Sequence, residues 1–227
     1  MISDQGFDQF NIWEHSANVK ELYRRRCRQE EPEMDCAAQA IEILAPLAEP
    51  GDQLLDAGCG SGYFFHSVRR IGMDLTYEGI DASRCLIEIG REELPPYGCD
   101  PSRLNVMRME DLVGSVDHAV CLNVLSNIDN YHRPLERLLL AARKSVIIRE
   151  SLWEKPSQYL YVHDKFLDPE VNLKVHVNTY CLLEVLKFAQ SYGFSGEAII
   201  DRRTRGRPEP VIGYDHHWAF LVFRRNK

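Results

Sequence analysis

The chain has 227 residues, of which 44% are hydrophobic and 27% charged, a composition typical of a globular protein with one well-buried domain. Its formal net charge of −7 argues against a nucleic acid as the main partner, because nucleic-acid binders usually display net positive surface. The seven cysteines are scattered and odd in number, and no stretch approaches about 18 apolar residues, so we expect a cytoplasmic protein with reduced thiols and no membrane partner.

Apolar residues recur along the chain first at helical spacing and then in alternating strand and helix patterns. The expected helices cover 19–27, 37–44, 64–71, 86–89, 135–142 and 182–189, and the expected strands cover 54–57, 75–80, 104–109, 116–122, 146–148, 197–202 and 216–224. This alternation predicts βαβ units and a parallel sheet with right-handed crossovers. The polar turn 203–208 predicts that the last two strands form a closing hairpin, while the segment 151–177 breaks the alternation.

The run 54–63, LLDAGCGSGY, is the most informative segment, because an apolar strand ends in a carboxylate and three glycines then lead into a helix. Gly58, Gly60 and Gly62 allow backbone conformations that other residues rarely adopt and let a ligand approach the backbone closely. A dinucleotide-binding loop has the spacing G-x-G-x-x-G, and the position of its last glycine holds Tyr63 here. The spacing therefore disfavours an NAD(P)-dependent oxidoreductase, which is kept as an alternative.

The D-x-G-x-G-x-G form of this loop resembles motif I of the class I S-adenosylmethionine (AdoMet)-dependent methyltransferases. The resemblance implies a Rossmann-like α/β fold: a three-layer sandwich with a mostly parallel seven-stranded sheet of order 3-2-1-4-5-7-6, its last strand antiparallel, and an N-terminal helical cap. It also implies AdoMet as cofactor and S-adenosylhomocysteine as product, with the loop against the methionyl part. Cys59 then needs no redox role, because loops of this family often carry cysteine as a small residue.

Acidic residues follow two further expected strands at their carboxyl ends, where open α/β sheets bind ligands. Asp81, followed by Ala82, resembles motif II of the family, which implies that its carboxylate accepts the hydroxyls of the cofactor ribose. Its alternative role is to cap the next helix. Glu110 and Asp111 resemble the segment that holds the adenine, where Asp111 would accept from the 6-amino group and the Glu110 amide would meet N1. The alternative is an acidic surface loop.

The fourth expected strand leads into Asn123 and Val124, which by the same resemblance lie under the sulfonium and its transferable methyl group. Asn123 would then serve both cofactor binding and catalysis, or else it only caps the following turn. After the first strand, Asp56 would complement the ammonium group of the methionyl part, and the amides at 61–63 would help to hold its carboxylate.

Aromatic residues in the segment after the fifth strand are the candidates for catalysis on the acceptor side. Tyr159, Tyr161 and His163 would share one face of an extended segment. His163 is the candidate general base, because an imidazole accepts a proton near neutral pH, and Tyr161 beside it is the second catalytic candidate. The alternative is that 163–165 form a solvated surface.

Three tyrosines are the candidates for substrate binding: Tyr159, Tyr180 at the start of the late helix, and Tyr23 on an N-terminal helix. The family resemblance implies that the N-terminal segment, with Tyr23 or Trp13, closes over the substrate, whereas core packing is the alternative for each aromatic. The basic clusters 24–26 and 202–207 are typical of solvated faces, unless one lies near the cleft and recognises an anionic group of the acceptor.

The residues Asp215, His216 and His217 are of types that bind metals, but neighbours on a strand point to opposite faces. We therefore expect no metal.

Together these features predict one methyltransferase domain over 1–227, divided into an N-terminal cap 1–48, an AdoMet-binding half 49–150, an acceptor-side insertion 151–180, and a late helix with closing hairpin 181–227. The expected reaction is O- or N-methylation of a small-molecule acceptor by in-line displacement, in a monomer or homodimer. The family's N-P-P-[YF] signature is absent after the fourth strand, which disfavours nucleic-acid bases and glutamine as acceptors. A non-catalytic AdoMet-binding scaffold protein is the alternative.

Overall fold

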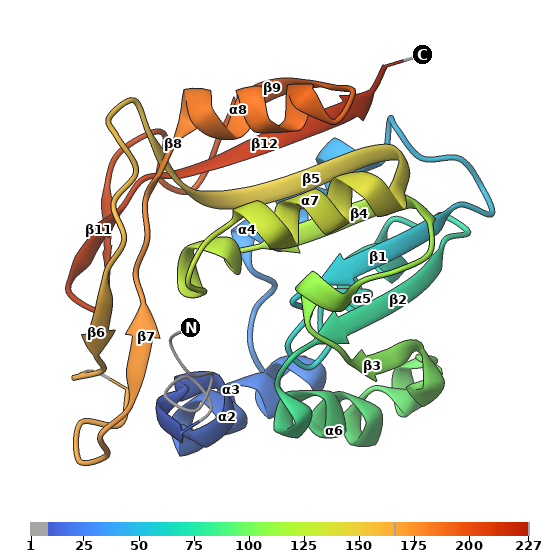
Figure 1. The fold of residues 1–227 in the computed structure, drawn as a ribbon. Coiled ribbons are helices and arrows are strands. Elements are labelled where there is room, and N and C mark those ends of the chain that lie inside the picture. The colour runs from blue at the N-terminus through green and yellow to red at the C-terminus, as the bar shows by residue number, and fades with distance from the viewer. Residues whose placement is uncertain (1–8, 166, 227) are drawn as a thin grey trace.

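The computed structural model describes residues 9–165 and 167–226 and has a central sheet with helices on both faces (Figure 1). The strands of this sheet are β1 (Gln53–Ala57), β2 (Thr76–Asp81), β3 (Leu104–Val106), β4 (Val116–Leu122), β5 (Ala142–Trp153), β8 (Tyr180–Cys181), β9 (Phe194–Ile200) and β12 (Trp218–Arg225). Their order is β3-β2-β1-β4-β5-β12-β9, and the short β8 pairs with the end of β5. Because β9 and β12 are the sixth and seventh strands of this path along the chain, the predicted order 3-2-1-4-5-7-6 is confirmed.

The sheet is parallel from β3 to β5, whereas β12 pairs antiparallel with both β5 and β9. The strands β1, β4 and β5 are mostly buried, as expected for parallel strands covered by helices on both faces. The carboxyl ends of β1, β2 and β4 meet at one edge of the sheet, which is where sheets of this type bind ligands.

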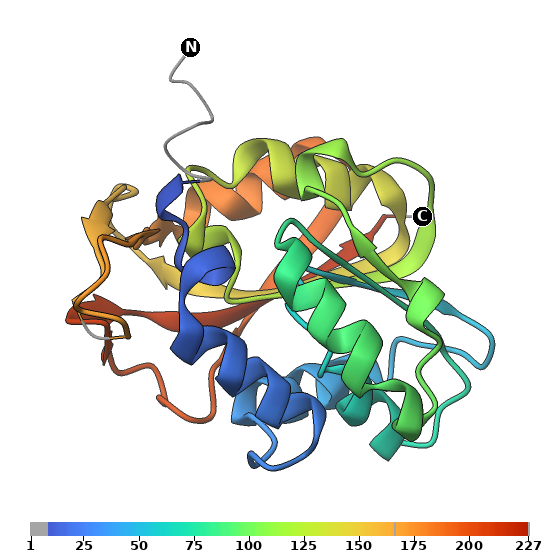
Figure 2. The same cartoon turned by 90° about the horizontal axis from the view of Figure 1, so that it is seen from below.

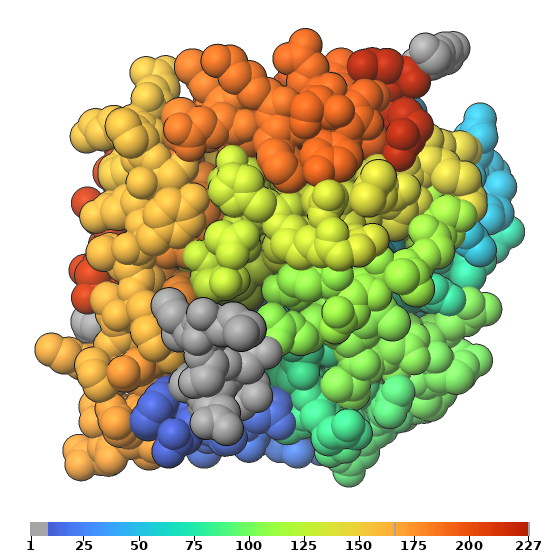
Figure 3. Space-filling view, viewed as in Figure 1, coloured from blue at the N-terminus to red at the C-terminus, as the bar shows by residue number. Residues whose placement is uncertain are grey.

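The helices divide between the two faces of the sheet according to their apolar stripes. They are α2 (Ile12–His15), α3 (Ala17–Cys27), α4 (Asp35–Leu44), α5 (Phe65–Arg70), α6 (Arg84–Glu93), α7 (His132–Ala141) and α8 (Leu182–Ser191). One cluster of buried side chains joins α4, α5 and α6 to one face, and a second cluster joins α7 and α8 to the other. In the space-filling view α7 and α8 lie side by side over this second face (Figure 3).

Four short 3-10 turns complete the helical segments: η1 (Pro95–Tyr97), η2 (Pro101–Arg103), η3 (Met109–Asp111) and η4 (Leu125–Asn127). Within the described residues, every helix is too short or too polar to cross a lipid bilayer.

A serine caps the N-terminus of each of the two helices that border the sheet edge. The Ser16 hydroxyl accepts a hydrogen bond from the Val19 amide at 3.0 Å at the start of α3, and the Ser83 hydroxyl accepts from the Leu86 amide at 3.4 Å at the start of α6. Figure 2 shows that α3 and α6 lie beside each other. The N-terminal helices therefore cover the ends of β1 and β2, as the predicted helical cap required.

Two strands differ from their predicted lengths by three residues or more. β3 ends at Val106, and the expected strand residues up to 109 give way to η3, because this edge strand has only β2 as a partner and β2 ends at Asp81. β5 continues to Trp153, into the segment predicted as an insertion, because β12 supplies it with a second partner as far as Ser151.

The rest of that segment forms a small antiparallel pair, β6 (Tyr161–His163) with β7 (Lys174–His176), which we call the β6–β7 ribbon. A second pair, β10 (Glu209–Val211) with β11 (Tyr214–His216), lies in the turn between β9 and β12. Ile12 of α2 packs with both pairs in a small core of its own. These three segments form one accessory lobe at the carboxyl edge of the sheet (Figure 1).

Candidate cofactor and acceptor site

The glycine loop, residues 58–62, connects β1 to the start of α5. Gly58, Gly60 and Gly62 have φ angles of 74°, 57° and 77°, in the left-handed region that residues with side chains rarely adopt. The Gly58 amide donates to the Ile80 carbonyl at 2.8 Å, which ties the loop to the end of β2. These φ angles explain why glycine occupies all three positions, as predicted.

Asp81, at the end of β2, holds the glycine loop through its carboxylate. One oxygen accepts from the Gly60 amide at 2.8 Å, and the other accepts from the Ser83 amide at 2.7 Å. Burial raises the pKa of Asp81 to about 6, although both hydrogen bonds act in the opposite direction. Each carboxylate oxygen has a second lone pair, so the capping role and a role in ribose binding are compatible. Ala82 beside it is exposed.

Two buried residues of the β1 end, Asp56 and Cys59, line the inner side of the loop. Asp56 is 4% exposed, its carboxylate accepts from the Tyr77 hydroxyl at 2.7 Å, and burial raises its pKa to about 7. The Cys59 sulfur lies 2.8 Å from the position that a Cβ at Gly79 would take. Burial raises the pKa of the Cys59 thiol well above its ordinary value, so Cys59 packs as a small apolar side chain.

Tyr23 of α3 lies over the glycine loop, and its ring occupies the space that a Cβ at Gly60 would take. The ring meets Trp13 and Tyr63 edge-on, with centroid distances of 6.4 and 5.6 Å. The Arg26 guanidinium stacks over Tyr23 and Tyr63 at 5.2 and 5.0 Å from the ring centroids. In the described part of the chain no carboxylate pairs with this guanidinium, which lines a pocket of about 540 Å³ beside Tyr63. Tyr23 thus covers the glycine loop, and beside it lies an arginine that the sequence showed only as part of a basic cluster.

Asn123 and Val124 follow β4 and lie beside the glycine loop. A methyl carbon of Val124 is 2.5 Å from the position that a Cβ at Gly58 would take, so the loop and this residue are in contact. Asn123 has a φ of 61°, a conformation that asparagine adopts more readily than most residues. Its Oδ1 accepts from Arg149, whose Nε donates to Asp201 at 2.7 Å. The structure thus brings both predicted residues to the loop.

Two charged residues near the end of β5, Arg149 and Glu150, were not predicted to belong to the site. Arg149 is 3% exposed, and its guanidinium carbon lies 4.4 Å from the ring centroid of Trp218. Glu150 is fully buried, and its carboxylate accepts the amides of residues 124–126 at 3.0, 2.9 and 2.8 Å. The two side chains hold the chain after β4 from opposite faces of the sheet. Two adjacent charged residues within an apolar strand are the sequence signal that could have identified Arg149 and Glu150, because a buried charge needs a partner.

The turn η3 places Glu110 and Asp111 just beyond the end of β3, at the sheet edge that carries the glycine loop. Glu110 is half-buried and pairs with Arg108 at 3.4 Å, whereas Asp111 is exposed. The Asp111 amide donates to the Arg108 carbonyl at 3.1 Å and closes the turn. Of the two predicted adenine-binding residues, Glu110 therefore has the more enclosed carboxylate.

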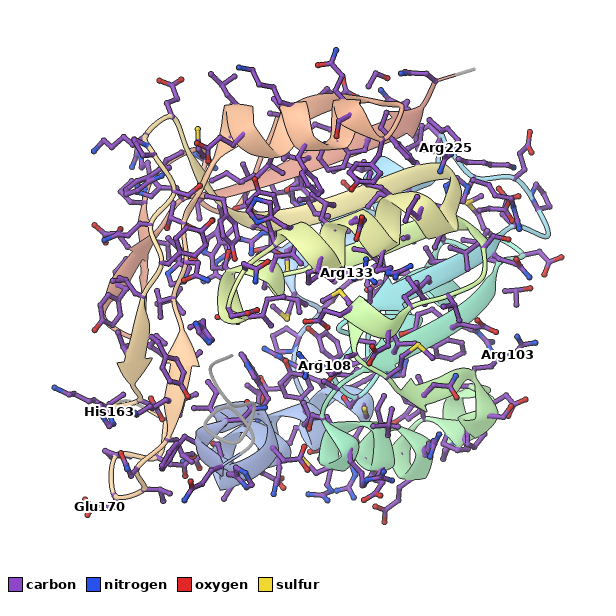
Figure 4. All side chains as sticks on the ribbon, in the orientation of Figure 1. Arg103, Arg108, Arg133, His163, Glu170 and Arg225 are labelled. Carbon is purple, nitrogen blue, oxygen red and sulfur yellow. The ribbon has the colours of Figure 1, made fainter. Side chains whose placement is uncertain are left out.

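The structure does not bring Tyr161 and His163 to the glycine loop. Val162 between them packs in the core of the accessory lobe, so both neighbouring side chains lie on the opposite face of the β6–β7 ribbon. His163 is exposed and points outward from the molecule (Figure 4), and Tyr161 is 42% exposed. The predicted roles of His163 as general base and of Tyr161 as its catalytic neighbour are therefore corrected, because strand alternation directs both to the outer surface.

The two other predicted substrate-binding tyrosines lie near the end of β5. Tyr180 is 1% exposed, and its hydroxyl donates to the Leu125 carbonyl at 2.5 Å. Tyr159 is 48% exposed, with its ring centroid 5.8 Å from that of Tyr180. The predicted direct contact of Tyr180 with substrate is corrected by this burial, since its hydroxyl instead fixes the turn after β4.

The two histidines at the end of β11 have different neighbours. The His216 ring is buried, lies with Nδ1 3.0 Å from the Tyr214 carbonyl and stacks on Trp218 at 4.7 Å between centroids. The ring of His217 lies 5.5 Å from that of Trp153. Among the described residues no three potential ligands are grouped as a metal site would need.

Comparison with known proteins places this geometry in context. A family model described as a methyltransferase domain matches residues 25–195, which is most of the chain. A search of curated protein sequences found no match.

Many solved structures resemble the fold at low sequence identity. Magnesium protoporphyrin IX methyltransferase from Synechocystis PCC 6803, with bound SAM, is 15% identical, and the match covers 99% of this chain and 98% of that chain with a TM-score of 0.64. A S-adenosylmethionine-dependent methyltransferase from Clostridium acetobutylicum ATCC 824 is 12% identical over 91% and 97% of the two chains, with a TM-score of 0.65. The 1,6-didemethyltoxoflavin-N1-methyltransferase of Burkholderia thailandensis is 14% identical over 96% and 82%, with a TM-score of 0.58. At such identities these likenesses show the fold.

Proposed function

Because the chain belongs to the methyltransferase-domain family and has the class I fold, we propose that it transfers the methyl group of AdoMet to an oxygen or nitrogen of a small molecule. S-adenosylhomocysteine is then the second product. One observation carries the proposal: the glycine loop is bonded to Asp81 of β2 and touches Val124 after β4. The ends of β1, β2 and β4 therefore border one binding site. AdoMet requires such a site, because its ribose and its methyl-bearing sulfonium lie at different points along the molecule.

The groups around this seat fit the parts of AdoMet. Asp81 has free lone pairs for the two ribose hydroxyls, and Glu110 with Asp111 stands at the next strand end for the adenine. The Arg26 guanidinium has free N–H donors beside the loop for the methionyl carboxylate, and the buried carboxylate of Asp56 faces the loop for the ammonium group.

Bound AdoMet supplies an electrophilic methyl group on a sulfonium. The protein's part is to hold the acceptor in line with that group and to exclude water, effects that account for large rate enhancements on their own. Trp13 of α2 and Tyr23 of α3 cover the binding site, while Asn123 and Val124 form its floor. A transfer that depends on such positioning does not need His163 as a general base.

The contacts of the accessory lobe are an argument that the methyl acceptor is a small molecule. The Ser16 hydroxyl donates to Asp168, and the Asn18 amide donates to the Leu167 carbonyl at 2.5 Å, so the start of α3 is bonded to the loop of the β6–β7 ribbon. This closes one side of the sheet edge against a large polymer. The net charge of −7 gives no support for a nucleic-acid partner.

We include in the proposal a single domain, a monomer or homodimer, and a cytoplasmic location, for which the seven free thiols are the support. The basic turn 202–207 is given no role in the reaction, since Arg202 pairs with Glu42 and Arg203 with Glu209 at the surface.

Two alternatives differ from this proposal in what they bind or transfer. An NAD(P)-dependent oxidoreductase would bind NAD or NADP, and a scaffold protein would bind AdoMet without transferring its methyl group. We expect calorimetry to show saturable binding of AdoMet and S-adenosylhomocysteine but not of NAD or NADP. Binding of NAD or NADP in place of AdoMet would overturn the proposal, and so would AdoMet binding without transfer of labelled methyl to any component of a small-molecule extract.

A further inference from the structure

A hollow of about 540 Å³ lies between α5 and the residues that join α3 to α4, and we call it the α5 hollow. Its wall includes Tyr63, which follows the glycine loop, but none of the residues 58–62 and none of those at the ends of β2 and β4. Pockets of roughly 300–1,000 Å³ bind small molecules in proteins. The α5 hollow is therefore large enough for a ligand of its own, apart from the site proposed for AdoMet.

Three arginines line the α5 hollow, and two of them carry charges that no described carboxylate balances. Arg70 donates to Glu33 at 3.0 Å, and Glu31, the other acidic residue of the wall, pairs with an arginine outside the hollow. Arg26 and Arg69 form no ion pair with a carboxylate in the part of the chain that the structure describes. In a chain with a net charge of −7, the hollow thus carries two positive charges in excess.

The guanidiniums of Arg26 and Arg69 are held by contacts that leave N–H donors free. Arg26 stacks over Tyr63, with its guanidinium carbon 5.0 Å from the ring centroid. Arg69 lies over the ring of Phe65 at 5.8 Å, and its Nη1 donates to the Tyr97 carbonyl at 3.1 Å. Stacking uses the flat faces of a guanidinium, whose five N–H donors lie in its plane. Both residues therefore still have donors for an anion, and a guanidinium fits phosphate and carboxylate through two parallel hydrogen bonds.

The uncharged part of the wall offers flat and apolar surface. His66 Nε2 lies 2.8 Å from the Cys27 carbonyl, which only accepts, so Nε2 carries the proton and Nδ1 accepts from the Gln29 amide at 3.1 Å. Burial lowers the pKa of His66, so its imidazole is neutral at neutral pH. The ring of Tyr97 meets this imidazole edge-on at 4.8 Å between centroids. The apolar residues of the wall are Pro32, Met34 and Ala37.

From this combination of charge and shape we propose that the α5 hollow binds a small anionic molecule with an aromatic ring, whose phosphate or carboxylate group meets Arg26 and Arg69. The tyrosines of the wall supply the surface on which the ring packs. A phosphate monoester carries about two negative charges at neutral pH, whereas a carboxylate carries one. Because the hollow has two positive charges in excess, we expect the phosphate monoester to bind more tightly than the carboxylate.

On the proposed function this site has a consequence, since Arg26 is also the residue proposed to hold the methionyl carboxylate of AdoMet. Arg26 lines the α5 hollow and stacks over Tyr23 at 5.2 Å, and the Tyr23 ring lies against the glycine loop. One guanidinium cannot give all its donors to two anions, so each ligand weakens the binding of the other. By linkage the factor is the same in both directions. The α5 hollow is then an inhibitory site.

The methionine methyl groups report where a ligand binds. Met34 lines the α5 hollow and accepts a hydrogen bond from the Tyr63 hydroxyl at 3.1 Å, whereas Met109 lies just beyond β3. The full-length protein, labelled with ¹³C at the methionine methyls, is titrated with phenyl phosphate, benzoate and the uncharged benzyl alcohol. We expect phenyl phosphate to shift the Met34 signal saturably and leave that of Met109 in place, with benzoate weaker and benzyl alcohol at least about tenfold weaker. An unmoved Met34 signal at millimolar phenyl phosphate, or equal affinity for benzyl alcohol, would overturn the site.

A pair of arginine variants tests which charge binds the anion. Arg69→Met removes one guanidinium of the hollow and lies outside the site proposed for AdoMet. We expect it to bind phenyl phosphate about tenfold more weakly, with an unchanged calorimetric affinity for AdoMet. Arg133→Met is the matched control, because Arg133 is an exposed arginine that pairs with Glu136 on α7, and it should match the wild type. Wild-type affinity in Arg69→Met, or the same loss in both variants, would refute the assignment.

Calorimetry with both ligands tests the competition for Arg26. We expect saturating phenyl phosphate to weaken AdoMet binding at least about threefold, and saturating AdoMet to weaken phenyl phosphate binding by the same factor. An AdoMet affinity that is unchanged by phenyl phosphate would overturn the inhibitory role. A protein that shifts Met34 with phenyl phosphate but does not bind AdoMet would overturn the proposed function and leave the anion site standing.

Discussion

The replacement Glu150→Gln tests how the buried carboxylate of β5 holds the chain after β4. Glu150 offers two acceptor oxygens, one to the amides of Val124 and Leu125 and the other to the amide of Ser126. Glutamine keeps one of these oxygens and sets an NH2 group against the third amide. One buried N–H then loses its partner, which corresponds to a loss of about 1–3 kcal/mol in the free energy of unfolding.

The loss should depend on pH, because burial raises the pKa of Glu150 from its ordinary value of 4.5 to about 7. A carboxyl group whose pKa is higher in the folded than in the unfolded protein contributes stability below pH 4.5 and loses it as the pH rises through about 7. Glutamine does not titrate. The difference between wild type and Glu150→Gln should therefore be largest at pH 5 and shrink towards pH 8, by at most about 1.4 kcal/mol per pH unit.

Urea denaturation at pH 5 and pH 8 measures both quantities. Glu154→Gln is the control, because Glu154 is exposed and its replacement should change stability by less than about 0.5 kcal/mol. A difference that grows from pH 5 to pH 8 would show that the three amides favour the ionised carboxylate more than burial disfavours it, and the reasoning would fail.

Three further predictions concern the charges around the site. Arg149→Met should lower the free energy of unfolding by about 3–5 kcal/mol, because it leaves Asp201 as an unpaired buried carboxylate, and a loss below about 1 kcal/mol in urea denaturation would contradict this. AdoMet affinity should fall by up to about tenfold per pH unit below pH 6, because protonation of Asp81 removes acceptors for the ribose, so a calorimetric Kd that is flat down to pH 5 would count against its role. Arg26→Leu should weaken AdoMet binding about tenfold, whereas Arg25→Leu should not, and equal affinities would remove Arg26 from the site.

The sequence predicted those parts of the molecule that depend on local patterns. The strand order and the closing antiparallel strand followed from alternating apolar segments and the family resemblance, and the glycine loop followed from its spacing. Asn123 and Val124 were predicted from the resemblance of the fourth strand to that of the family, and in the structure the end of β4 does adjoin the end of β1. Residues at strand ends are placed by topology alone, which explains why these predictions were possible.

The acceptor side depends on contacts that no local pattern encodes. The direction of His163 follows from Val162, whose apolar partners lie on α2 and in β10–β11, far away in the sequence. Arg149 and Glu150 were missed because their partners lie far from them in the sequence. Neighbouring residues of β5 point to opposite faces of the sheet, so Arg149 meets Asn123 and Glu150 meets the amides after it only once the sheet has formed. The predicted general base was wrong for the same reason, since it rested on residue type and spacing within one short segment.

The central claim is that the glycine loop 58–62 is the seat of AdoMet, and a pair of glycine variants tests it most directly. Gly60 and Gly72 have similar φ angles of 57° and 66°, so alanine costs similar backbone strain at each. A Cβ at Gly60 would run into Tyr23 over the loop, whereas a Cβ at Gly72 would have nothing within 4 Å. In calorimetric titrations with AdoMet we expect the wild type and Gly72→Ala to bind alike and Gly60→Ala to bind at least about tenfold more weakly. Equal affinity of all three proteins, or no binding by the wild type, would contradict the claim.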